Sequence, residues 1–91
     1  MPDLLHEYWE DEDGGTFGPV SMDGDRLRLT VTPGERFVFS LWAPSQHRAM
    51  QLYQERLGYG DYVPVDGVPD HFYTDEEAAE QETYLRTRKV S

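Results

Sequence analysis

Apolar and polar residues alternate most regularly over residues 26–32, where every second position carries leucine or valine and the others carry arginine or threonine. This period of two is typical of a β-strand with one apolar and one solvated face. Alternation over Arg36–Trp42 predicts a second strand, with apolar residues on both faces. Weaker patterns predict a third strand over Leu4–Glu10 and a short fourth strand over Phe17–Ser21.

Two later segments carry helix signals. Ser45 can cap a first helical turn and Gly58 can adopt the left-handed conformation after a last one, so we predict a helix over Ser45–Leu57. Its apolar side chains gather on one side. Thr74 opens the sequence Thr-Asp-Glu-Glu, a capping box that predicts a second helix near the C-terminal end of the sequence. This second helix has few apolar residues to bury.

The segment between the helices, residues 59–73, contains two prolines and two glycines and is expected to be a loop with a short edge strand at Tyr62–Val65. The predicted fold class is therefore α+β, with a small antiparallel sheet of three to five strands, one helix packed on a face, and a second, C-terminal helix. One contiguous core is expected from two strands and the first helix. Its predicted members are Leu27, Leu29, Val31, Phe37, Phe39, Leu41, Met50, Leu52, Tyr53 and Leu57.

Composition indicates a single small acidic domain over residues 1–91. The chain has 18 acidic and 8 basic side chains, a net charge of −10, and 13% aromatic residues. The first 25 residues have no basic side chain, whereas residues 26–58 hold five arginines and two acids. We expect the flanking acids to neutralise part of that basic middle within the fold. The overall charge argues against direct binding of nucleic acid, and no apolar run is long enough to span a membrane.

No sequence motif for catalysis, metal binding or cofactor binding is present. The acidic run over residues 10–13 lacks the ligand spacing of an EF-hand calcium loop and is expected to be a solvated turn between strands. Asp70, His71 and Asp75 are close enough in sequence to form a metal site, a question that the sequence leaves open. Cysteine is absent, which excludes disulfides and thiol chemistry. We therefore favour a protein without metal, cofactor or catalytic activity.

Two features are typical of binding surfaces. The acidic run concentrates negative charge, and the tyrosines of the glycine-containing stretch after the first helix offer large contact area with few rotatable bonds. The same tyrosines can instead cover the edge of the core, and the sequence leaves both alternatives open. The expected binding residues are Glu10, Asp11, Glu12, Asp13, Tyr59 and Tyr62.

These features favour a non-catalytic, cytoplasmic protein-interaction or regulatory module that docks its acidic surface onto a basic protein surface. The cytoplasmic assignment rests on the first residues, which lack the basic and apolar regions of a secretory signal. The alternative is a nucleic-acid mimic of the phage anti-restriction or anti-CRISPR type, which occupies a cationic groove. A small enzyme or ligand binder with a site assembled by the fold is the third and weakest hypothesis. The sequence does not indicate an oligomeric state.

Overall fold

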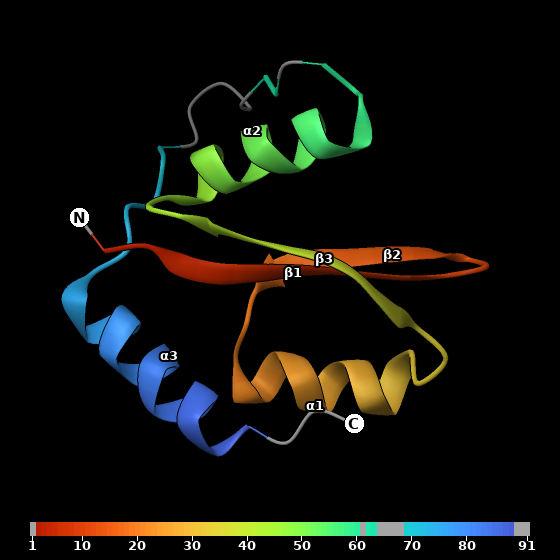
Figure 1. Cartoon of the computed structure of the whole chain (residues 1–91), viewed down its shortest axis with the longest axis horizontal. Helices are drawn as coiled ribbons and strands as arrows, with labels where there is room; N and C mark the ends of the chain where they lie inside the picture. The colour runs from red at the N-terminus through yellow and green to blue at the C-terminus, as the bar shows by residue number, and fades with distance from the viewer. Residues whose placement is uncertain (1, 61, 64–68, 89–91) are drawn as a thin grey trace.

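A computed structural model describes residues 2–60, 62–63 and 69–88 (Figure 1). Its centre is a three-stranded antiparallel sheet in the order β2-β1-β3. The strands are β1 (Leu4–Asp11), β2 (Gly14–Pro19) and β3 (Arg36–Ala43). The helices are α1 (Met22–Val31), α2 (Gln46–Leu57) and α3 (Asp75–Thr87). The predicted α+β class, with three strands and a C-terminal helix, is confirmed.

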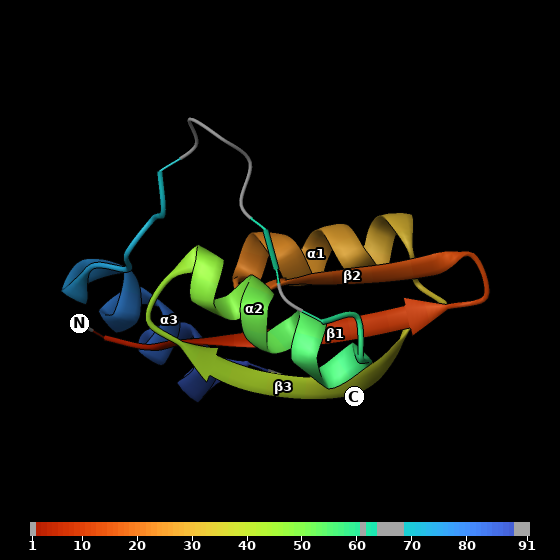
Figure 2. The same ribbon diagram turned by 90° about the horizontal axis from the view of Figure 1, so that it is seen from above.

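The helices cover both faces of the sheet. α2 lies across one face, and α1 and α3 lie against the other (Figures 1 and 2). The central strand β1 alternates between these layers, as a period of two requires. Leu4, His6 and Tyr8 are buried on the α2 side, whereas Glu7 and Trp9 face the side of α1 and α3. Charged and aromatic groups from distant parts of the sequence therefore meet β1 on the α1 side.

An aromatic cluster fills the space between α2 and the sheet. Tyr53 of α2 stacks on Phe17, with ring centroids 4.4 Å apart, and meets the Tyr8 ring edge-on at 5.3 Å. Tyr8 lies 5.4 Å from Phe39, which is buried. Gly15 is needed beside this cluster, because a Cβ atom at this position would lie 2.6 Å from the Tyr8 ring. Buried aromatic pairs of this kind stabilise a core beyond the area that they remove from water.

Capping chemistry fixes the ends of α2 and α3 as the sequence predicted. The Ser45 hydroxyl accepts a hydrogen bond from the Arg48 backbone N–H, and Gly58 closes α2 in the left-handed conformation with a φ of 75°. Thr74 and Glu77 form both hydrogen bonds of a capping box at the start of α3. Both predicted helices are confirmed, and so are the strands predicted over residues 4–10 and 36–42.

The strand predicted over residues 26–32 is wrong, because these residues belong to α1 and the turn that follows it. Ser21 caps this helix by accepting a hydrogen bond from the Gly24 N–H at 2.9 Å, and two aspartates in the first turn suit the helix dipole. No α1 residue is buried. Leu27, Leu29 and Val31 are 63–65% exposed, so the prediction that they belong to the core is also wrong.

A register shift in β3 changes the position of another predicted core residue. Phe39 lies opposite Tyr8 whereas Phe37 lies opposite Trp9, so one extra residue, Val38, stands between the two pairs. Such a bulge places Phe37 and Phe39 on opposite faces of the sheet. Phe37 is therefore 49% exposed on the α1 side instead of lying in the core.

The remaining core predictions are correct in part. Phe39 is buried, and the five other members from β3 and α2 are half-buried: Leu41, Met50, Leu52, Tyr53 and Leu57. The buried apolar residues that the sequence analysis did not place in the core are Leu4, Tyr8, Val20, Ala43, Ala49 and Tyr73. The core therefore includes residues of β1, such as Leu4 and Tyr8, a strand from which the prediction took no core residue.

β2 covers Gly14–Pro19 and so begins earlier than the strand predicted over Phe17–Ser21. The edge strand predicted at Tyr62–Val65 lies partly outside the described residues, and Tyr62 and Val63 are not in a strand.

Within the described ranges, every helix is too short or too polar to cross a bilayer.

Candidate functional site

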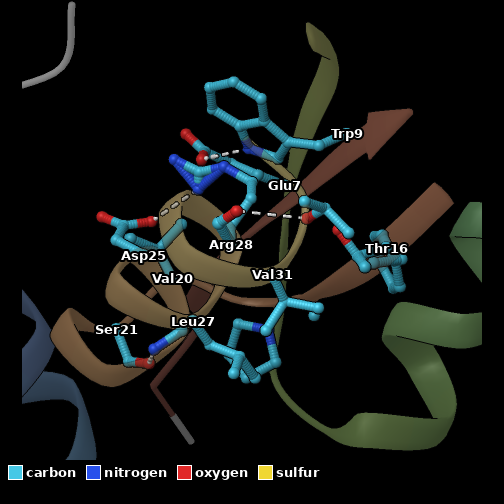
Figure 3. A pocket seen from close by; sticks show the side chains of 14 residues that line it. Glu7, Trp9, Thr16, Val20, Ser21, Asp25, Leu27, Arg28 and Val31 are labelled. Carbon is cyan, nitrogen blue, oxygen red and sulfur yellow. Dashed lines mark hydrogen bonds and ion pairs between the residues drawn. The ribbon is translucent and has the colours of Figure 1, made fainter. Parts of the chain in front are cut away.

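A cavity of about 270 Å³ separates α1 from the sheet (Figure 3). Leu27 and Val31 of α1 form part of its apolar wall, together with the end of β2. Glu7 and Trp9 of β1 line it from the sheet. Asp25 and Arg28 of α1 also line the cavity and connect this helix to the sheet through polar contacts.

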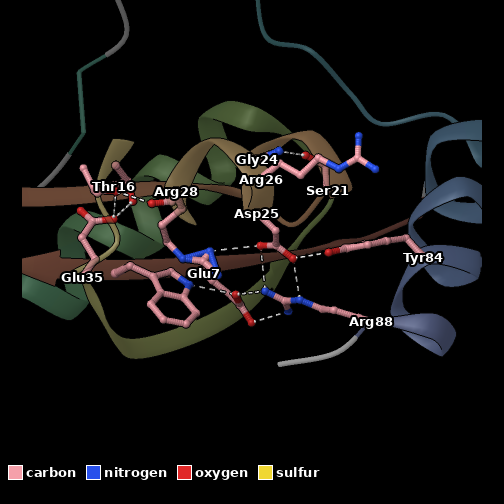
Figure 4. Close-up of polar contacts among 12 residues, drawn as sticks. Glu7, Thr16, Ser21, Gly24, Asp25, Arg26, Arg28, Glu35, Tyr84 and Arg88 are labelled. Carbon is pink, nitrogen blue, oxygen red and sulfur yellow. Dashed lines mark hydrogen bonds and ion pairs between the residues drawn. The ribbon is translucent and has the colours of Figure 1, made fainter. Parts of the chain in front are cut away.

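Four charged side chains form a cluster beside this cavity: Glu7, Asp25, Arg28 and Arg88 (Figure 4). The Arg88 guanidinium donates to Glu7 Oε1 from Nη2 at 2.6 Å and to Asp25 Oδ2 from Nε at 2.8 Å. Its side chain is 6% exposed, and those of Glu7 and Asp25 are 14% and 16% exposed. This charge cluster joins β1, α1 and the C-cap residue that follows α3.

Arg28 and Trp9 extend the charge cluster toward the cavity. The Arg28 guanidinium lies 3.7 Å from the centre of the Trp9 ring and 3.2 Å from Asp25 Oδ1. The indole N–H of Trp9 donates to Glu7 Oε1 at 3.0 Å. A cation over an indole face is the strongest form of the cation–π contact. The Trp9 indole is therefore fixed by Arg28 over its ring face and by Glu7 at its ring nitrogen.

The cluster shifts the protonation equilibria of its members. Burial raises the pKa of the Glu7 carboxyl, but hydrogen bonds from Arg88 and Trp9 outweigh burial and hold that pKa below its ordinary value. Hydrogen bonds to Glu7 raise the pKa of Arg88 despite its burial. Tyr84 donates its hydroxyl hydrogen to Asp25, and burial together with this contact raises the pKa of Tyr84. Two carboxylates thus face two guanidiniums, and each charge is matched within the cluster.

The other face of the sheet holds a buried histidine that the sequence analysis did not single out. His6 is 1% exposed; its Nδ1 lies 2.9 Å from the Leu4 carbonyl oxygen and its Nε2 lies 2.7 Å from the Tyr73 hydroxyl. Both contacts are satisfied by a neutral ring that donates from Nδ1 and accepts at Nε2. Burial lowers the pKa of His6 and raises the pKa of Tyr73 to about 12. The lowered pKa of His6 favours the neutral ring, and the pair connects β1 to the residue before the N-cap of α3.

The structure places the predicted acidic residues in one region. Glu10 and Asp11 end β1, and Glu12 and Asp13 form the turn to β2, as expected for a solvated turn between strands. The Asp11 carboxylate accepts a hydrogen bond from the Asp13 N–H at 2.9 Å. Arg36 approaches Glu10 at 4.0 Å. We call residues 10–13 the acidic tip.

The two predicted tyrosines lie in different environments. Tyr59 is 68% exposed just beyond the end of α2. Tyr62 is half-buried; its backbone N–H donates to the Gln51 side chain, and its ring lies 5.8 Å from that of His47, in the first turn of α2. Tyr62 therefore lies beside the first half of α2. The start of α2 and the turn between β1 and β2, which carries the acidic tip, lie at opposite ends of the sheet (Figure 1).

A different aromatic pair adjoins the acidic tip. Trp9 directly precedes Glu10, and the Phe37 ring packs against its indole with centroids 5.7 Å apart and the ring planes at 72°. Phe37 is 49% exposed, whereas Trp9 is half-buried. The sequence analysis missed this pair, because a bulge in β3 brings Phe37 to the α1 side.

Asp70, His71 and Asp75 do not converge on a common point. The Asp70 carboxylate accepts a hydrogen bond from the His47 N–H at 2.9 Å, and hydrogen bonds like this one lower the pKa of Asp70 although burial raises it. His71 instead contacts the Glu77 carboxylate at 3.0 Å. In the part of the chain that the structure describes, no group of three or more histidine or acidic side chains is arranged to hold a metal ion.

Comparison with known proteins gives no further guide to the site. No protein-family model, no curated protein and no solved structure matches the chain.

Proposed function

We propose that this protein is a non-catalytic, cytoplasmic interaction module that binds a basic protein surface through the acidic tip, with Phe37 as an aromatic anchor. The observation that carries the proposal is the half-exposed Phe37 ring, which packs against Trp9, the residue that directly precedes the acidic tip. Glu12 and Asp13 are exposed, and within the described ranges neither forms an ion pair. Their charge is available to a partner.

The remaining charges support this assignment. Arg28 and Arg88 are committed to the charge cluster, so they do not neutralise the acidic tip. Exposed carboxylates at the rim of an interface act mainly on the association rate, since their field attracts a partner of opposite charge. A basic surface is the partner that fits a chain with a net charge of −10.

Phe37 has the features of an anchor. Its ring is half-exposed, and its other side is supported by Trp9, which is itself held by Arg28 and Glu7. A preformed aromatic surface loses little entropy on binding, so more of the contact energy appears as affinity. Such residues act mostly on the dissociation rate. The charges that line the cavity already have partners in each other, which supports a structural role for them instead of a catalytic one.

The proposal is tested by capturing binding proteins from the source cell with the full chain and measuring kinetics with each purified candidate. The variant Glu12→Gln/Asp13→Asn should slow association and weaken its salt dependence. The matched control Glu76→Gln/Glu80→Gln changes two exposed acids of α3 and should leave both unchanged. Phe37→Ala should speed dissociation, with a loss of roughly 2 kcal/mol.

Two results would replace the proposal. Equal effects of the two acidic variants would show that only total charge matters and that the acidic tip is not the contact. Competition by DNA or RNA for the same captured protein would favour the nucleic-acid mimic. Tyr59→Ala, measured in the same series, decides whether the exposed tyrosine after α2 is a second anchor.

A further inference from the structure

The outer edge of β3 is open. β3 pairs with β1 along one side, and no strand among the described residues pairs with the other side. The strand is eight residues long, contains neither proline nor glycine, and exposes Val38 and Trp42 at 40% and 55%. An unpaired edge of this length and composition readily accepts another strand.

The segment directly before β3 is weakly held as a helix. α1 has ten residues and none of them is buried, although helices of this length depend on packing for their stability. The Thr30 hydroxyl bonds back to the Arg26 carbonyl at 2.8 Å, a contact that slightly destabilises helices. β-Branched Thr30 and Val31 also favour extended backbone. The main contacts of α1 with the sheet and α3 run through Asp25 and Arg28.

The same segment matches the open edge as a strand. Its apolar residues recur at every second position, so a register with Leu29 opposite Phe39 also brings Leu27 opposite Leu41. Phe39 and Leu41 lie on the α2 side of the sheet, opposite Tyr8 and His6. In that register Leu27 and Leu29 would extend the core from the positions where α1 leaves them exposed. The chain already reverses between the two segments, since the Glu35 N–H donates to the Thr32 carbonyl at 3.1 Å.

The connection to β2 is long enough for this rearrangement. Pro19 lies opposite His6 on β1, and Arg26 would lie beside Trp42, which pairs with the neighbouring Leu5. Pro19 and Arg26 would thus lie at the same end of the sheet, separated by three strand spacings, or about 14 Å. The stretch from Pro19 to Arg26 reaches about 23 Å when extended. Pairing would be antiparallel throughout the enlarged sheet.

We propose that residues 26–32 have a second, less populated state in which they leave α1 and pair as a fourth strand with the outer edge of β3. The segment is the occupant that fits this edge, because it has the reversing turn and two exposed apolar side chains, Leu27 and Leu29, whose spacing matches Leu41 and Phe39. In this state the β3 edge is covered, and the cavity over Glu7 and Trp9 is open to solvent. The inference goes beyond the proposed function and does not depend on it.

Disulfide trapping tests the proposal, because the chain has no cysteine of its own. Paired residues of antiparallel strands have Cα atoms about 5 Å apart, within the range for a disulfide. Arg26→Cys/Trp42→Cys is the pair in register, and Arg26→Cys/Val38→Cys is the control, four residues out of register. A state populated at about 1% should still give clearly faster oxidation of the first pair, by roughly tenfold over the control.

Arg28→Thr, added to both pairs, removes the contacts of α1 with Trp9 and Asp25. The rate for the in-register pair should rise several-fold while that of the control stays constant. Equal oxidation rates for the two pairs would overturn the proposal, and so would an equal rise of both rates in Arg28→Thr. Either result would show that α1 unfolds without pairing in a specific register. A disulfide that joins two chains through the Trp42→Cys position would also overturn the proposal, since a second copy would then be the occupant of the edge.

Discussion

Arg88→Ala should be among the most destabilising single changes in this protein. The Arg88 side chain is 6% exposed and contacts the carboxylates of Glu7 and Asp25 at 2.6 and 2.8 Å. Removing one partner of a buried ion pair costs about 3–5 kcal/mol, because the other charge is left without compensation. In the variant, the Asp25 carboxylate still has Arg28 and Tyr84 as partners, and the Glu7 carboxylate still accepts a hydrogen bond from the Trp9 N–H. We therefore expect a loss of about 2–4 kcal/mol in the free energy of unfolding.

Arg86→Ala, in the last turn of α3 and two residues before Arg88, is a matched control. Arg86 pairs with Glu82 at 2.6 Å, but the two side chains are 73% and 66% exposed. An exposed pair at this helical spacing contributes only about 0.3–0.5 kcal/mol. Both variants remove one arginine, so their effects on net charge are identical.

The measurement is equilibrium unfolding in urea, followed by circular dichroism so that the signal does not depend on Trp9. In a thermal melt of a domain of this size, the same loss in Arg88→Ala lowers the melting temperature by roughly 8–30 °C. If Arg88→Ala and Arg86→Ala differ by less than about 0.5 kcal/mol, the charge cluster does not hold the layers together and our account of it is wrong.

Two further predictions concern the α2 side of the sheet. The pKa of His6 in the folded state is below 6.5, so the unfolded chain binds more protons, and stability should be full above pH 6.5 and fall as the pH decreases below it. This part of the pH dependence, measured by urea unfolding, should be absent in His6→Gln, and an unchanged profile in that variant would refute the assignment. Gly15→Ala should cost about 1–3 kcal/mol because its methyl group meets the Tyr8 ring at 2.6 Å. Gly18→Ala is its control and should be nearly neutral in the same melts, since nothing lies within 4 Å of the added atom.

The helices α2 and α3 were predictable because their signals are local. Ser45, Gly58 and Thr74 act within a few residues of themselves, and the structure uses each of them as expected. α1 was not predictable from its pattern, since Leu27, Leu29 and Val31 have the period of a strand and remain exposed in the helix. Pattern analysis assumes that apolar residues are buried, and it fails where the fold leaves them in solvent.

The charge cluster was not predictable for a different reason. Glu7 and Arg88 are 81 positions apart, and only the completed sheet and α3 bring them together. One signal was present: Glu7 lies between Leu5 and Trp9 on a single face of β1, where an acid needs a buried partner. The sequence could indicate that a cation was required there, but not which arginine would supply it. The expected neutralisation of the basic middle by flanking acids within the fold is seen at Arg28, whereas Arg36 approaches Glu10 only at the exposed surface.

The hydrogen bonds that join β1 to Gln81 and Arg88 bear on how the chain folds. Gln81 acts like a strand residue toward the backbone of Leu5, donating to its carbonyl at 3.0 Å and accepting from its N–H at 2.8 Å. Together with Arg88, it makes the central strand depend on residues that lie 76 and 81 positions later in the chain than their partners. Closing so long a loop is entropically unfavourable until both contacts form, and contacts between distant residues slow folding. During synthesis, Leu5 and Glu7 of β1 therefore lack these partners until α3 has left the ribosome.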